Sequence, residues 1–70
     1  MPTGQIPVPG AIVQFSGYEY NPRYGHVGIV TEVSGDTMII KDMNYSGLYN
    51  VTVRQVSVSD PAIDGYIYVD

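Results

Sequence analysis

The chain has 70 residues, a formal net charge of −4, a single histidine and no cysteine. This length accommodates one small domain, and the lack of cysteine excludes both a disulfide framework and the usual Cys/His zinc sites. The only Lys and Arg residues are Arg23, Lys41 and Arg54, too few to neutralise a nucleic-acid backbone, and no apolar run is long enough to span a membrane.

The first residues predict an extended lead-in. Three prolines and two glycines fall within MPTGQIPVPG, and proline removes the N–H group that helices and strand ladders require. We therefore expect a Pro/Gly-rich lead-in at residues 1–9 and a single β domain at residues 10–70. The Ile- and Val-rich residues 11–15 predict a first strand, and the turn-rich stretch 16–24 predicts a loop.

The centre of the chain predicts a β-hairpin that begins near the histidine, His26, and returns through Asp42 and Asn44. A two-residue loop at 35–36 would put His26 and Asp42 on opposite faces. A three-residue loop at 34–36 would put His26 opposite Asn44 and diagonal to Asp42 on one face, within side-chain reach. We favour the three-residue loop, because a glycine there fits a type I turn followed by a bulge.

Two further strands are predicted, at residues 49–56 and 65–69. Residues 57–64 between them, which contain Asp60-Pro61, are predicted to form a turn or a single helical turn. Arg54, in the first of them, is predicted to be a solvated or paired strand cation. No stretch of ten residues has a helical period. The expected fold class is all-β, a small antiparallel sheet of about five strands rolled into a partly open SH3-like barrel.

Both faces of the predicted hairpin carry apolar side chains. The even-numbered face holds Val30, Met38 and Ile40 beside His26 and Asp42, and the odd-numbered face holds Val27, Ile29, Val33, Ile39 and Met43. A sheet that is apolar on both faces is normally covered on both. We expect that this chain does not supply the second layer and that the even-numbered face is a docking surface. If the chain is a minimal fragment, the expected occupant of that face is a second copy of the chain.

A family resemblance is carried by the runs GAIVQF (10–15), YGHVGIVTEVSGDTMIIKDMNYSGLYNVTVRQV (24–56) and DPAIDGYIYV (60–69). Together they resemble the C-terminal, β-sheet half of a CHAP domain, the cysteine, histidine-dependent amidohydrolase/peptidase family. The most specific feature is Gly-His-Val-Gly-Ile-Val, followed from residue 42 by acidic-x-Asn-aromatic. The resemblance implies a papain-like fold and cleavage of amide bonds in peptidoglycan. It also implies that His26 is the general base, that Asp42 orients its ring, and that Asn44 can serve the same role.

In the family, N-terminal helices supply the nucleophilic cysteine, which these 70 residues lack. Neither Ser16 nor Ser46, both in predicted turns, has the helix start or strained elbow of a substitute nucleophile. We therefore expect a fragment or degenerate relative of a CHAP-type peptidoglycan hydrolase, a cysteine amidase or endopeptidase, that is inactive alone. The alternatives are a non-catalytic β-barrel that binds cell-wall material, peptide or its own copy, and a minimal fragment, natural or engineered, that self-associates.

The remaining expectations concern ligands and partners. Tyr18, Tyr20 and Tyr24 are candidates for a substrate rim, with simple packing as the alternative. We expect no cofactor and no metal, because the calcium of some relatives is held by their N-terminal half. Expected partners are a Cys-bearing helical segment, a second copy of the chain, or peptidoglycan. The family implies a cell-wall, extracellular or phage-borne setting, although no signal peptide is recognisable.

Overall fold

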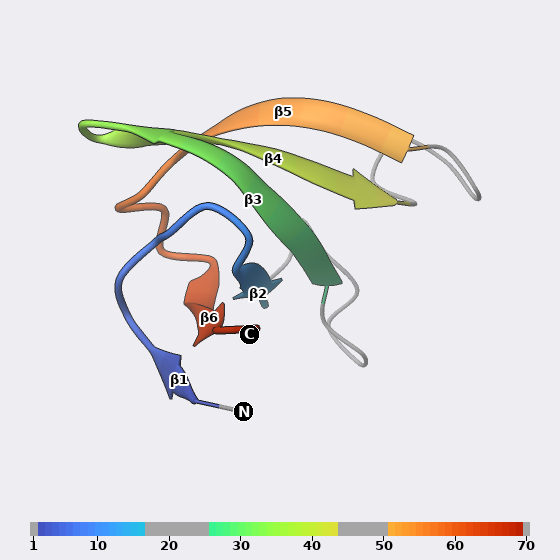
Figure 1. Cartoon of the computed structure of the whole chain (residues 1–70). Coiled ribbons are helices and arrows are strands. Elements are labelled where there is room, and N and C mark those ends of the chain that lie inside the picture. The colour runs from blue at the N-terminus through green and yellow to red at the C-terminus, as the bar shows by residue number, and fades with distance from the viewer. Residues whose placement is uncertain (1, 17–25, 44–50, 70) are drawn as a thin grey trace.

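The computed structural model describes residues 2–16, 26–43 and 51–69, and these form one antiparallel sheet of six strands without a helix (Figure 1). The strands are β1 (Thr3–Gly4), β2 (Ile12–Phe15), β3 (His26–Ser34), β4 (Thr37–Met43), β5 (Val51–Ser57) and β6 (Ile63–Ile67). Their order across the sheet is β1-β6-β2-β3-β4-β5. The all-β prediction is confirmed. β1 and β5 are the two edges of the sheet, which is not closed into a barrel.

One strand, β1, was not predicted, and it lies in the segment that was expected to be an unpaired lead-in. Thr3 and Gly4 pair with Ile67 and Tyr66 of β6. This pairing is possible because neither Thr3 nor Gly4 is a proline, although prolines flank them on both sides. Tyr68 strengthens the attachment, since its hydroxyl donates a hydrogen bond to the Ile6 carbonyl at 2.7 Å. The lead-in therefore adds a short edge strand, which brings the sheet to six strands where about five were predicted.

The sheet curves so that β3, β4 and β5 arch over β2 and β6 (Figure 1). The core fills the inside of this arch and consists of Ala11, Val13, Phe15, Val30, Met38, Ile40, Val56 and Tyr66. The even-numbered face of the hairpin points into it, and Val30 and Ile40 are both completely buried. The expectation of an uncovered even-numbered face was therefore wrong, because the chain covers that face with its own strands β2 and β6.

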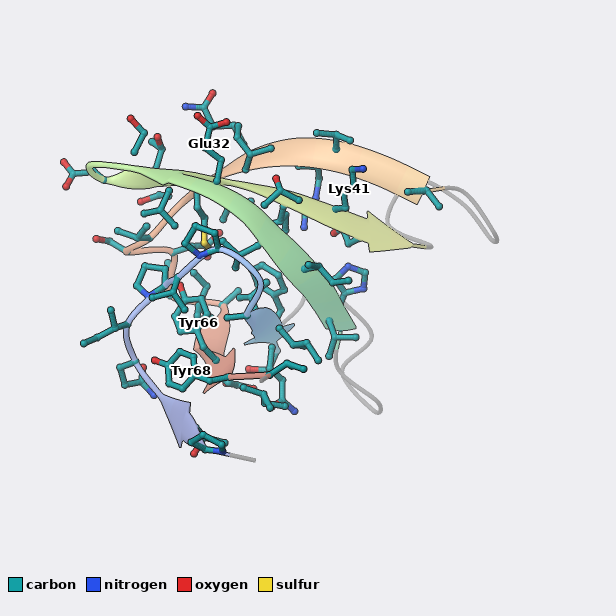
Figure 2. All side chains as sticks on the ribbon, viewed as in Figure 1. Glu32, Lys41, Tyr66 and Tyr68 are labelled. Carbon is teal, nitrogen blue, oxygen red and sulfur yellow. The ribbon has the colours of Figure 1, made fainter. Side chains whose placement is uncertain are left out.

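The outer face of the arch carries the exposed apolar side chains. Val27, Ile29, Val51 and Val53 are each more than half exposed, at 54%, 52%, 63% and 61%. Figure 2 shows Glu32 and Lys41 on this outer side and Tyr66 on the inner side. We call Val27, Ile29, Val51 and Val53 the outer apolar patch. It belongs to the odd-numbered side of the hairpin and the matching side of β5.

The hairpin β3–β4 combines two registers. Next to the turn, Ser34 pairs with Thr37, so the loop has only two residues, Gly35 and Asp36, and the three-residue prediction was wrong. Gly35 adopts the left-handed conformation, with φ of 58°, which glycine tolerates without strain. The register then shifts between Val30 and Glu32, as in a β-bulge. Beyond the bulge, Gly28 pairs with Asp42 as predicted.

Candidate active site

His26 is the first residue of β3, and Asp42 is the last but one of β4. Because Gly28 is directly opposite Asp42, His26 is diagonal to the carboxylate on the same face. The His26 Nε2 and Asp42 Oδ2 atoms are 2.7 Å apart. The predicted encounter of histidine and carboxylate is therefore present in the structure.

The Asp42 carboxylate also binds Arg54 of β5. Arg54 Nη2 donates to Oδ2 at 2.6 Å, and Nε donates to Oδ2 at 3.0 Å and to Oδ1 at 3.3 Å. The Asp42 side chain has no exposed surface, whereas those of His26 and Arg54 retain 12% and 15%. A buried carboxylate is tolerated only when its charge is paired and hydrogen-bonded, and Arg54 supplies both.

Phe15 of β2 forms the floor beneath this cluster. It pairs with His26 in the β2–β3 ladder and is completely buried. The ring centroids of Phe15 and His26 are 6.0 Å apart, inclined by 40°, and the Arg54 guanidinium carbon lies 5.8 Å from the Phe15 centroid. The imidazole and the guanidinium thus rest on one aromatic ring, which restricts how far either can swing.

The contact with Asp42 decides which nitrogen of a neutral His26 is the base. An ionised carboxylate can only accept hydrogen bonds. The Nε2 atom must then carry the proton that it donates to Asp42 Oδ2 at 2.7 Å. The lone pair of a neutral imidazole is left on Nδ1. The arrangement therefore presents Nδ1 as the basic atom, with the ring held from behind through Nε2.

The other predicted site residues have different outcomes. Asn44, Tyr18, Tyr20 and Tyr24 lie outside the described residues, as does the serine at position 46. Ser16 is described, and its hydroxyl donates a hydrogen bond to Asp64 Oδ1 of β6 at 2.8 Å. In the sheet, β2 lies between β6 and β3, so this contact is made toward β6 and not toward His26 of β3. Nothing places that hydroxyl beside His26.

The contact of Arg54 with Asp42 is the feature of the site that the sequence reasoning missed. Arg54 was predicted to be either a solvated or a paired strand cation, and the structure shows it paired with Asp42, a partner that was not identified. The signal was available in the alternation of β5, which puts Arg54 on the opposite face from Val51 and Val53. A cation on the inner face needs an anion, and Asp42 was the carboxylate already placed there.

An open hollow of ≈ 460 Å³ adjoins the site on the outer side. Its lining is mainly apolar and comprises Ile12, Val27, Gly28, Ile29, Lys41, Asp42 and Val51. Two of these residues, Gly28 and Asp42, are the opposed pair that sets the position of the carboxylate. The outer apolar patch and the His26–Asp42 pair are therefore neighbours across the thickness of one sheet.

Residues 2–16, 26–43 and 51–69 contain no group of three or more His, Cys, Asp or Glu side chains arranged to hold a metal ion. The same residues include no helix with the length and hydropathy needed to cross a membrane. Within the described residues, the cluster of His26, Asp42 and Arg54 brings a possible base, a buried carboxylate and a cation together.

These features define a small antiparallel-sheet domain that carries a histidine held by a buried carboxylate. The family model for the CHAP domain matches residues 1–44, more than half of the chain. The chain therefore belongs to the CHAP domain family, a family of the peptidoglycan-hydrolase type. The match includes both His26 and Asp42 and ends before Arg54. No curated protein and no solved structure matches the chain.

Proposed function

We propose that this chain is the base-carrying part of a CHAP-type cysteine hydrolase that cleaves amide bonds in peptidoglycan, with His26 as general base and Asp42 as the residue that orients it. The observation that carries the proposal is the 2.7 Å contact between His26 Nε2 and Asp42 Oδ2, in a chain that belongs to the CHAP family. Asn44, two residues beyond Asp42, is proposed as a further orienting group.

The proposed reaction requires a cysteine from polypeptide outside these 70 residues, because none is present in them. His26 Nδ1 takes the proton from the thiol, and the thiolate sulfur forms a bond to the amide carbon. The imidazolium then gives its proton to the amide nitrogen as the C–N bond breaks, which leaves a thioester. Water, deprotonated by the same Nδ1, attacks the thioester carbon and releases the acid and the free thiol.

Two physical features support a second layer of polypeptide beside this sheet. Val27, Ile29, Val51 and Val53 expose apolar surface on one face, and sheets that are apolar on both faces are normally covered on both. The hollow of ≈ 460 Å³ gives that face a concave place for apolar side chains. A further segment of polypeptide, supplied by the same protein or by a separate chain, is the proposed occupant of this face. Because the His26 side chain lies on the opposite face of the sheet, the cysteine itself has to reach His26 from that other side.

The test joins this chain by a flexible linker to the Cys-bearing helical half of a CHAP domain, so that assembly does not depend on concentration. Release of new amino groups from purified peptidoglycan is then measured with and without a reducing agent. We expect release that requires the cysteine, is lost in H26A, and persists in E32Q, an exposed control on the same strand. A folded fusion that releases nothing, or equal release by H26A, would contradict the proposal.

The outer apolar patch also favours a second candidate, a non-catalytic module that associates with its own copy or binds cell-wall material. Sedimentation of the chain alone over a range of concentrations, and its co-sedimentation with peptidoglycan, separate the two candidates. The non-catalytic module predicts association or binding together with an inactive fusion. A monomer that does not bind peptidoglycan contradicts this candidate.

A further inference from the structure

We propose that Arg54 is a positioning residue for His26, acting through the Asp42 carboxylate. The inference rests on the proposed function for its catalytic meaning, but its structural content concerns this chain alone. Arg54 lies beyond the residues that the family model matches, 1–44. Its contribution would extend the orienting group from a single carboxylate to a carboxylate and guanidinium acting together.

The contacts show how the positioning works. Asp42 Oδ2 receives both His26 Nε2, at 2.7 Å, and Arg54 Nη2, at 2.6 Å. The Nε atom of Arg54 spans the two oxygens, at 3.0 Å from Oδ2 and 3.3 Å from Oδ1. Two donors from one planar group fix the plane of a carboxylate as well as its position. The rotation that would turn Oδ2 away from His26 is thereby opposed.

The strand order explains how the contacts of Asp42 with His26 and Arg54 are held in place. β4 lies between β3 and β5, so His26 and Arg54 reach Asp42 from opposite neighbouring strands. Arg54 pairs with Ile40 in the β4–β5 ladder, which puts it diagonal to Asp42 just as His26 is on the other side. Each end of the cluster is therefore fixed by backbone ladders, and Phe15 lies beneath both the imidazole and the guanidinium.

Charge adds a second effect. The Asp42 side chain is fully buried, and a buried carboxylate with one partner removed is strongly unfavourable. Without Arg54, the carboxylate recovers hydration by turning toward water and away from Phe15. His26 then loses the acceptor that holds its Nε2–H. Arginine suits this position better than lysine, because a lysine ammonium is a point charge without the planar fork.

The experiment uses the lone histidine of the chain as its own reporter. The ring ¹⁵N shifts and the nuclear Overhauser contacts between His26 and Phe15 are recorded for the 70-residue chain at about pH 8.5, above the ordinary range of imidazole protonation. The variants are R54M, which removes the guanidinium, and R54K, which keeps a positive charge without the fork. K41M is the matched control, because it removes one exposed positive charge from the outer face of β4.

We expect the parent chain and K41M to show one Nε2–H tautomer and defined contacts to Phe15. In R54M the ¹⁵N shifts move toward the tautomer mixture of free histidine, and the contacts to Phe15 weaken. R54K shows the same change in a chain that remains folded, which keeps the test valid if R54M does not fold. A ring signature in R54K or folded R54M identical to that of the parent would overturn the proposal. Since no cleavage is measured, an inactive fusion would leave this result unaffected.

Discussion

Gly28 of β3 lies directly opposite Asp42 of β4, and a Cβ atom at position 28 would lie 3.2 Å from the Asp42 Cβ and 3.1 Å from the Lys41 carbonyl oxygen. The separation from the Asp42 Cβ is shorter than the about 3.5–4.0 Å of ordinary carbon–carbon contacts. Both separations are tighter than most contacts that Cβ atoms make in proteins. The missing side chain of Gly28 therefore makes room for the carboxylate that holds His26. The glycine is part of the site although it contributes no functional group.

Substitution of Gly28 by alanine tests this relationship. We expect G28A to lower the free energy of unfolding by about 1–3 kcal/mol, the usual cost of overpacking, because one of the close neighbours is backbone and cannot rotate away. Urea unfolding of the chain measures the change. The adjacent V27A, at a residue that is 54% exposed, is the control and should cost much less. A neutral G28A would show that the strands separate easily at this point.

The bulge at Thr31 leads to a second prediction. Thr31 has no Cα partner in the ladder, whereas Glu32 pairs with Ile39 and Val30 pairs with Ile40. Deletion of Thr31 removes the extra residue and joins the two registers into one regular ladder, so that Gly28 stays opposite Asp42. We expect backbone nuclear Overhauser contacts between Gly28 and Asp42 to persist in the deletion variant. Their loss would mean that the bulge itself, through its twist, holds the strand ends together.

The third prediction is that the chain loses stability at alkaline pH because of the Tyr66 hydroxyl. Burial, and to a smaller degree the neighbouring Tyr68, raises the pKa of the Tyr66 hydroxyl above its ordinary value of 10.0. Below that value the phenol is protonated in both states, so this contribution to stability is fully present. As the pH rises above it, the unfolded chain releases the proton first, and the contribution is lost as the pH approaches and passes the folded pKa.

The measurement is thermal unfolding from pH 8 to above pH 10, the latter being the ordinary pKa of tyrosine. The parent chain should lose stability in the alkaline range, and Y66F should lose less. Y66F also removes the hydrogen bond from the Tyr66 hydroxyl to Met38 Sδ, so the two chains are compared by their change from pH 8, not by absolute stability. Identical slopes for the two chains would contradict the assignment.

The outer apolar patch supplies a fourth prediction. Val51 and Val53 are 63% and 61% exposed, so V51T and V53T should each change the free energy of unfolding by about 0.5 kcal/mol or less. If a helical segment covers this face, both substitutions should weaken its binding when the two parts are mixed without a linker. V13T, at a buried core residue, is the contrasting variant and should destabilise the chain itself. Unchanged binding by V51T and V53T would place the partner elsewhere.

The sequence predicted the elements and the central encounter because both depend on local patterns. Alternation identified β2, β3, β4 and β5, and Asp60 accepts the Ala62 N–H at 2.9 Å in the predicted turn. The diagonal relation of His26 and Asp42 was also predicted, but from a loop length that was wrong. A two-residue loop with a bulge at Thr31 gives the same pairing at residue 28 as the predicted three-residue loop.

Other features could not be derived because they depend on long-range geometry. The pairing of Thr3 and Gly4 with β6 joins the two ends of the chain, and no local pattern in a Pro-rich segment indicates it. The burial of Val30, Met38 and Ile40 depends on how far the sheet curves. That curvature determined which face is left exposed, and so moved the proposed docking surface from the even-numbered to the odd-numbered side.

The most direct test of the central claim is the reactivity of the partner cysteine in the linked protein. Since this chain contributes no cysteine, a partner with one cysteine gives a single reporter, and its rate of alkylation by iodoacetamide near neutral pH measures the thiolate that His26 generates. We predict a rate about tenfold or more higher with His26 present than in H26A. Equal rates in folded H26A and parent proteins would contradict the assignment of His26 as the base.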